Sequence, residues 1–116
     1  MIVGGWDVAD KLVGCGLLLP ATTLTEACYQ YMFYYCSSLT SAPALPATQL
    51  ATACYFGMFY DCSNLTTAYV KAGYDYNNCD FIFSGCQNLG SCTLYTDGNW
   101  DNCNDISQWT KVAYPN

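Results

Sequence analysis

One block of sequence occurs twice in succession in this chain, and this internal repeat constrains the fold more than any other feature. Residues 19–44 read LPATTLTEACYQYMFYYCSSLTSAPA and residues 45–70 read LPATQLATACYFGMFYDCSNLTTAYV, with 16 of 26 positions identical and no gap. A single copy cannot bury its apolar side alone, whereas similar copies stacked along one axis can. The repeat therefore predicts a stack of short, similar units.

Partial copies lie on both sides of these two blocks. Residues 71–94 form a decayed third copy, with one residue lost between the first cysteine and the phenylalanine of the motif. Residues 1–18 contain the end of an earlier, incomplete copy, and residues 95–116 depart from the pattern. We therefore predict one domain over residues 1–116, made of a truncated N-terminal repeat or cap (1–18), repeats at 19–44 and 45–70, a decayed repeat at 71–94 and a C-terminal cap at 95–116.

Stacking would place equivalent residues of each copy side by side in ladders. The expected ladders are Cys28, Cys54, Cys79 and Cys103; Cys36, Cys62 and Cys86; Phe33, Phe59 and Phe83; and Leu39, Leu65 and Leu89. Because the chain has nine cysteines, at least one stays unpaired if all disulfides are internal. We expect the ladder cysteines to be buried thiols. Structural disulfides are the alternative, although neighbouring rungs lie about 4.8 Å apart and disulfide Cβ atoms only about 3.8 Å apart.

Each copy divides into a helical and an extended part. Apolar residues at positions 24, 28, 32 and 33 have helical spacing, which predicts a short helix or a few helical turns over residues 24–33. Residues 39–44 alternate small and apolar residues, which is typical of a short strand. The fold class predicted is an α/β-type repeat solenoid, with short parallel strands on one face and short helical turns on the other.

The repeated motif resembles that of a known family. The pattern A-C-Y-x-x-M-F-x-x-C-S-x-L-T-x-A, preceded by L-P-A-T-x-L, is complete at residues 27–42 and 53–68 and partial at residues 78–92. It is similar to the BspA-like leucine-rich repeats of bacterial surface proteins. The resemblance implies a leucine-rich-repeat-like solenoid, a cell-surface or extracellular location and a role in adhesion or host interaction, with no catalytic residues. Repeats of this kind are also compatible with a virion location, as decoration of a bacteriophage particle.

Composition excludes several functions. With three Lys, no Arg and a net charge of −6, the chain lacks the clustered cations that nucleic-acid binding requires. With no His, it has no Ser-His-Asp or Cys-His pair and no imidazole metal ligand. Residues 97–101 are similar to a calcium loop, but Asn102 and Gln108 replace its glycine and glutamate, so a polar turn is expected. The apolar run at residues 17–20 is too short for membrane insertion. We therefore expect no enzyme activity, cofactor or metal.

The positions that differ between the two full copies point to a candidate surface. Ladder positions in a core must keep their residue type, whereas outward positions are free to vary. The candidate ligand-binding residues are Thr40, Ser41, Thr66, Thr67, Tyr69, Ser91 and Thr93 on the expected strand face, together with Tyr31 and Tyr35. These residues predict a non-catalytic binding or adhesion module for a protein or glycan ligand, because tyrosines give contact area at small entropic cost. The alternatives are solvated strand residues without a ligand, and a structural spacer or decoration repeat.

Overall fold

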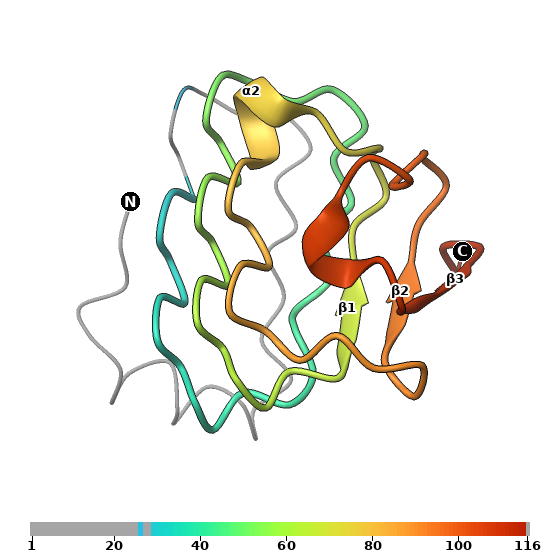
Figure 1. Cartoon of the computed structure of the whole chain (residues 1–116). Coiled ribbons are helices and arrows are strands. Elements are labelled where there is room, and N and C mark those ends of the chain that lie inside the picture. Colours follow the sequence, from blue (N-terminus) through green and yellow to red (C-terminus); the bar gives the residue numbers. More distant parts are fainter. Residues whose placement is uncertain (1–25, 27–28, 116) are drawn as a thin grey trace.

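A computed structural model describes residue 26 and residues 29–115 of the chain (Figure 1). The expected N-terminal cap at residues 1–18, and Leu24 and Cys28 of the first copy, lie outside the described residues. Regular elements are short: strand β1 (Thr67–Tyr69), helix α2 (Tyr76–Cys79), strand β2 (Thr93–Tyr95), 3-10 helix η2 (Asn104–Ile106) and strand β3 (Thr110–Val112). The rest of the described chain consists of turns and connections that run between them.

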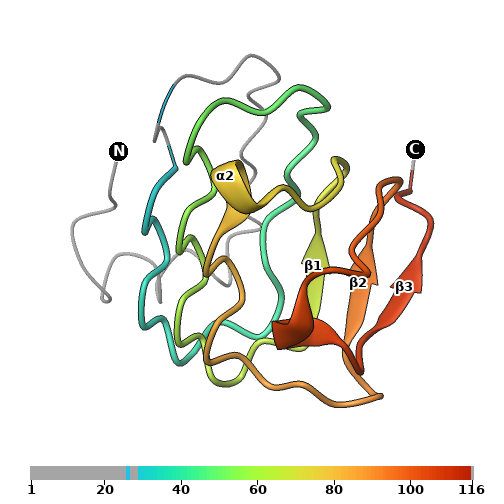
Figure 2. The same cartoon turned by 45° about the horizontal axis from the view of Figure 1, so that its top comes forward.

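The three strands form one parallel sheet in the order β1-β2-β3 (Figure 2). Thr67 pairs with Thr93, and Thr93 pairs in turn with Thr110. The central residues Ala68 and Leu94 are fully buried, because alternate side chains of a strand point to opposite faces. Among the described residues of the first copy, this pairing continues only through an isolated bridge that joins Ser41 to Thr67. The strand expected over residues 39–44 is therefore reduced to one bridge position.

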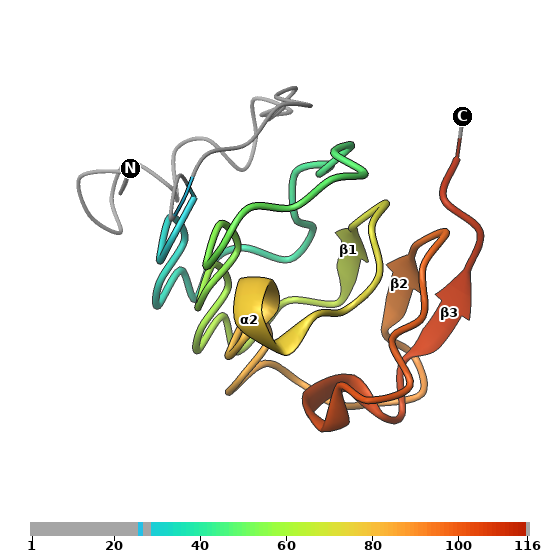
Figure 3. The ribbon, with the colours of Figure 1, turned by 90° about the horizontal axis from the view of Figure 1, so that it is seen from above.

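On the side away from the sheet, the described part of the first copy and the second copy are successions of turns. The N–H groups of Met32, Tyr34 and Cys36 donate to carbonyls three residues earlier, at 3.1–3.2 Å. The alternate N–H groups, of Tyr31, Phe33 and Tyr35, donate instead to carbonyls of the second copy at 2.8–2.9 Å. The helix expected over residues 24–33 is thus not formed in its described part, residues 29–33, because every second donor is used laterally. Figure 3 shows these segments of neighbouring copies lying side by side.

Two columns of these turns have a left-handed backbone. One column contains Tyr31, Gly57 and Phe81, with φ of 55°, 58° and 59°. The second, Tyr35, Asp61 and Gly85, has φ of 58°, 57° and 80°. A positive φ at the third residue is the mark of a type II turn and favours glycine. Positions 31 and 35, at which the first copy has other residues than the second, are therefore outward positions whose backbone is also left-handed.

The core is built from rings that stack across the copies. Phe33, Phe59 and Phe83 stack with centroids 5.6 and 5.7 Å apart and nearly parallel planes, as the repeat predicts. Trp100 and Trp109 then contact Phe83 at 5.7 and 5.5 Å and cover that end of the stack. Both indoles are buried, so residues beyond 94 contribute to the same core.

The expected leucine ladder is only partly formed. Leu39 and Leu65 are buried, but Leu89 is 50% exposed, so its assignment to the core is wrong. The connection from Cys86 to Thr93 is two residues longer than the one from Cys62 to Thr67. The extra length lets Leu89 leave the core while Thr93 still pairs with Thr67.

Thiols line the interior of the turns, and all the described ones except partly buried Cys86 are buried. The Sγ atoms of Cys62 and Cys86 donate to the carbonyls of Phe33 and Phe59, at 3.0 and 3.1 Å. Each bond crosses to the preceding copy and so adds to the lateral backbone bonds. Cys79 and Cys103 are also buried, at 0% and 3% exposure, and both carry free thiols.

Candidate functional site

The outward face of the sheet presents two rows of side chains. Thr67 and Tyr69 lie on either side of buried Ala68 in β1 and therefore share the opposite face. Thr93 and Tyr95 do the same in β2, in register with them. The rings of Tyr69 and Tyr95 are stacked, with centroids 4.7 Å apart and planes 8° apart. This sheet face is thus a hydroxyl row beside a tyrosine row.

Both rows continue beyond β1 and β2. Ser41 extends the hydroxyl row on one side, through its bridge to Thr67. Thr110 extends it on the other side, through its pairing with Thr93, and is exposed. Val112, 42% exposed, follows Tyr95 and ends the tyrosine row.

Three of the predicted strand-face residues lie outside these rows. Thr66 precedes β1, and its Oγ1 donates to the carbonyl of Thr40 at 3.1 Å. The hydroxyl proton of Thr66 is therefore used in a hydrogen bond to the neighbouring copy. Ser91 is exposed in a turn two residues before β2 begins. The structure therefore brings together Ser41, Thr67, Tyr69 and Thr93 and leaves Ser91, Thr40 and Thr66 at the margin.

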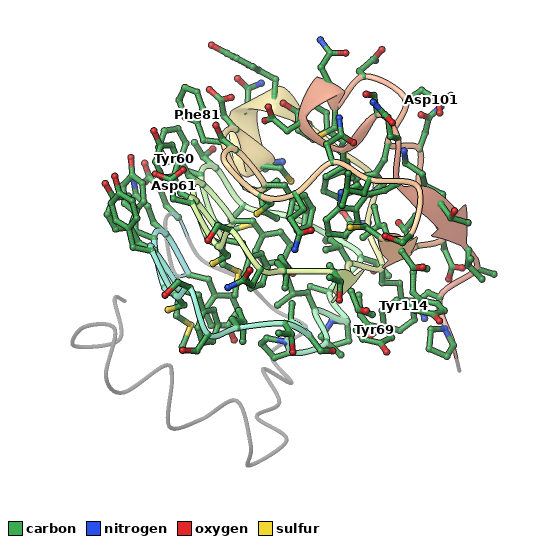
Figure 4. The ribbon with its side chains drawn as sticks, turned by 60° about the horizontal axis from the view of Figure 1, so that its bottom comes forward. Tyr60, Asp61, Tyr69, Phe81, Asp101 and Tyr114 are labelled. Atoms are coloured by element: carbon green, nitrogen blue, oxygen red, sulfur yellow. The ribbon has the colours of Figure 1, made fainter. Side chains whose placement is uncertain are left out.

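A cation borders the sheet face. The Nζ of Lys71 lies 5.5 Å from the ring centroid of Tyr114, within the range of a cation–π contact. The backbone N–H of Tyr114 donates to Asp97 Oδ1 at 3.2 Å, which fixes this last segment. Burial and the charge of Asp97 raise the pKa of Tyr114, so its hydroxyl stays a neutral donor at physiological pH. Figure 4 shows Tyr69 and Tyr114 on the same side of the molecule.

Sequence reasoning missed part of this face. Tyr95 was assigned to the C-terminal cap, yet it follows Tyr69 by one repeat length of 26 residues. The spacing itself was the signal that would have found it. Thr110 follows Thr93 by only 17 residues, so no repeat spacing identifies it.

Tyr31 and Tyr35 lie on a different surface, among the turns. They contact three further rings there, and Phe81 joins the group through two of these. We call the set the aromatic turn surface: Tyr31, Tyr34, Tyr35, Phe56, Tyr60 and Phe81. Figure 4 shows Tyr60 and Phe81 gathered with Asp61, well away from Tyr69. The structure therefore divides the predicted site residues between two surfaces.

Hydrogen bonds order the hydroxyl groups of the aromatic turn surface. A side-chain hydrogen bond with Tyr34 and a second with Asp61 raise the pKa of Tyr35 to about 12. The Tyr35 phenol is therefore neutral near pH 7, and the Asp61 carboxylate accepts from it. Tyr34 and Tyr60 are absent from the candidate residues because the turn candidates were drawn from positions that differ between the copies, and both copies have tyrosine here. Both side chains are half-buried.

The loop that is similar to a calcium site is held by its own side chains. The backbone N–H of Asp101 donates to Asn99 Oδ1 at 2.8 Å, and that of Gly98 donates to Thr96 Oγ1 at 3.1 Å. The Nε1 of Trp100 donates to the carbonyl of Ala72 at 3.0 Å. Within the described residues, no group of three or more His, Cys, Asp or Glu side chains is placed to hold a metal ion.

Residues 26 and 29–115 include no helix that is both long and apolar enough to cross a membrane. Comparisons of the chain with models of protein families, with curated proteins and with solved structures give no match.

Proposed function

We propose that this chain is a non-catalytic binding module, a segment of a leucine-rich-repeat-like solenoid that contacts a protein or glycan through its sheet face. The observation that carries the proposal is the alignment of like side chains across the strands. Thr67 pairs with Thr93 while Tyr69 stacks on Tyr95, so neighbouring strands present the same pair of groups. The bacterial-surface family that the motif resembles adds an expected location, at the cell surface or outside the cell, with a bacteriophage particle as the alternative.

The chemistry of the face favours an extended, uncharged ligand. Neighbouring strands are about 4.8 Å apart, so hydroxyls and phenols recur at that interval. A ligand that repeats its own groups along its length, such as an oligosaccharide or an extended peptide, meets the same partner at each step. Tyrosine edges provide apolar contact with a hydrogen-bonding tip, at small entropic cost. The ammonium of Lys71, at the border of the face, already contacts the Tyr114 ring, which is consistent with an uncharged ligand.

The side chains give little support to catalysis. The chain has no histidine to act as a base near neutral pH. Burial raises the pKa of the thiols of Cys79 and Cys86 to about 12, whereas a nucleophilic cysteine needs a lowered pKa and access to solvent. These features support a binding role over a catalytic one.

A glycan array and a panel of extended peptides test the proposal directly. The parent chain is expected to bind a ligand at micromolar concentration, and Tyr95→Ala to weaken that binding about tenfold through loss of ring contact. Tyr76→Ala is the matched control, because Tyr76 is a 68% exposed tyrosine of α2, outside the sheet. Equal loss in both variants, or no ligand in either panel, would contradict a sheet-face site and favour a structural spacer or decoration.

A further inference from the structure

On the aromatic turn surface, a column of stacked rings stops after two copies. Tyr34 and Tyr60 occupy equivalent positions and stack with centroids 5.3 Å apart and planes 16° apart. In the third copy the equivalent residue is Ser84, since Phe59 bonds to the carbonyl of Ile82 and Asp61 to that of Ser84. The phenylalanine column of the core continues to Phe83, but this outer column has a small side chain where a third ring would stand.

Three groups surround that position. Tyr60 lies on the side of the second copy, and its ring meets Phe81 edge to face, with centroids 6.3 Å apart and planes 78° apart. Phe81 is 46% exposed, so its ring is available to a ligand. The Asp61 carboxylate lies directly beside Gly85. A Cβ added to that glycine would collide with Asp61 Oδ1 and would lie 2.9 Å from Asp61 Cγ. The missing side chain at Gly85 thus leaves room for a carboxylate beside Ser84.

The charge at this corner is not balanced by a described cation. Lys71 lies over Tyr114, and the Nζ of Lys111 donates to the carbonyl of Ile106 at 2.7 Å. Both described lysines are therefore engaged near the sheet. The whole chain has a net charge of −6, which adds a long-range attraction for a positive partner.

The combination of rings and a carboxylate fits a planar cation. Aromatic faces attract cations, and a guanidinium can stack on a ring while its N–H groups fork to a carboxylate. A lysine ammonium is a strongly hydrated point charge that does not stack in this way. Neutral sugars would use the rings but would bring no positive charge to the Asp61 carboxylate, which already accepts a hydrogen bond from the Tyr35 phenol.

We propose that Tyr60, Phe81 and Asp61 form a binding site for an arginine side chain of a partner protein. The guanidinium takes the place of the absent third ring, next to Ser84, and pairs with the Asp61 carboxylate. The site lies apart from the sheet face and stands whatever ligand the sheet face binds (Figure 4).

The test compares three peptides of equal length that carry arginine, lysine or uncharged citrulline at the same positions, with binding followed by fluorescence anisotropy. The parent chain is expected to bind the arginine peptide several-fold more tightly than the lysine peptide, and the citrulline peptide least. Asp61→Asn should weaken the arginine peptide about tenfold, because a charge-assisted bidentate pair becomes a neutral one. Asparagine tolerates the left-handed φ of 57° at this position, so the fold is preserved.

Asp101→Asn is the matched control, since Asp101 is an exposed carboxylate far from this corner (Figure 4). Equal weakening by Asp61→Asn and Asp101→Asn would show attraction to the net charge alone and overturn the proposal. Equal affinity for arginine and lysine peptides, or no binding by the parent, would overturn it as well. Phe81→Gly removes the ring at a φ of 59° that glycine accepts, and unchanged affinity there would exclude the stacking contact.

Discussion

Alkaline pH should destabilise this protein through its buried thiols. Burial raises the pKa of Cys79 to about 12 and that of Cys103 to about 11. In the unfolded chain both thiols ionise at their ordinary pKa of about 8.5. A pKa that is higher in the folded state contributes stability that is complete below the unfolded value and is lost as pH rises toward the folded value. The loss therefore falls between about pH 9 and about pH 11.

The size of the effect follows from proton counting. Within that window the unfolded state has released a proton that the folded state keeps, so each thiol lowers the free energy of unfolding by about 1.4 kcal/mol per pH unit. Cys79 and Cys103 together give about 2.7 kcal/mol per pH unit. A domain of this size has a total stability of roughly 5–15 kcal/mol, so two pH units remove a large part of it.

Urea unfolding followed by circular dichroism at half-unit pH steps, with a reductant present, measures this slope. Tyrosines also ionise in this range, so the parent slope includes their contribution. Cys79→Ala isolates one thiol: its slope should be shallower than the parent slope by about 1.4 kcal/mol per pH unit, whatever its stability at pH 7. Cys103→Ala should behave alike. Parent and variant slopes that coincide would refute the reasoning, because the folded state would then accept the thiolate.

Three substitutions test the packing. Phe59→Ala removes the middle ring of the core stack and should cost about 3–5 kcal/mol in urea unfolding, whereas Phe81→Ala, half exposed, should cost less than about 1.5 kcal/mol. Gly57→Ala should lower thermal stability by about 1–2 kcal/mol or more, because φ is 58° and the new Cβ would lie 2.6 Å from Cδ1 of Tyr31; a stable variant would mean that this ring moves freely. Trp100→Phe loses the hydrogen bond from Nε1 to the carbonyl of Ala72 and should lower the free energy of unfolding by about 1–3 kcal/mol in chemical denaturation. No change would show that water donates to this carbonyl in place of the indole.

The lateral contacts were the most predictable part of the structure. Once similar copies lie side by side, identical residues at equivalent positions of the repeat become neighbours, as Phe33 and Phe59 do in the core. The same logic holds for Thr67 and Thr93, which are 26 residues apart and directly paired. It fails where the spacing changes, because the longer connection after Cys86 removes Leu89 from the core.

Identity between copies also proved to be a poor guide to burial. Tyr34 and Tyr60 are alike and yet half-buried, because rings that stack on each other at the surface benefit from matching as much as rings in the core. Conversely, positions 31 and 35 differ between copies although their backbone conformation is shared. Two columns of left-handed residues tolerate Tyr, Asp, Phe or Gly, and a sequence pattern does not reveal φ.

The helix expected in each copy illustrates a limit of periodicity. Apolar residues four apart indicate a helix when the alternative is a strand. Here the left-handed residues also recur every four positions, at Ala53, Gly57 and Asp61 of the second copy. A run of turns with that period presents one side to the core just as a helix does, so residue spacing alone does not separate them.

Ala53→Gly distinguishes a helix from a run of turns, because the substitution destabilises a helix but not a left-handed turn position. In a helix interior this change costs about 1 kcal/mol. Ala53 instead has φ of 56°, in a turn closed by the bond from Cys54 N–H to the Ala51 carbonyl at 3.1 Å. Relief of about 1–2 kcal/mol of left-handed strain outweighs the roughly 0.4–1 kcal/mol that glycine adds to unfolded-state entropy.

Ala53→Gly should therefore leave stability unchanged or raise it by up to about 1 kcal/mol in urea unfolding. Ala51→Gly is the matched control: Ala51 is half-buried and its φ is not positive, so glycine there should destabilise by about 0.5–1 kcal/mol. A loss of about 1 kcal/mol in both variants would mean that this segment is helical after all, and that the lateral N–H bonds between copies do not form in solution.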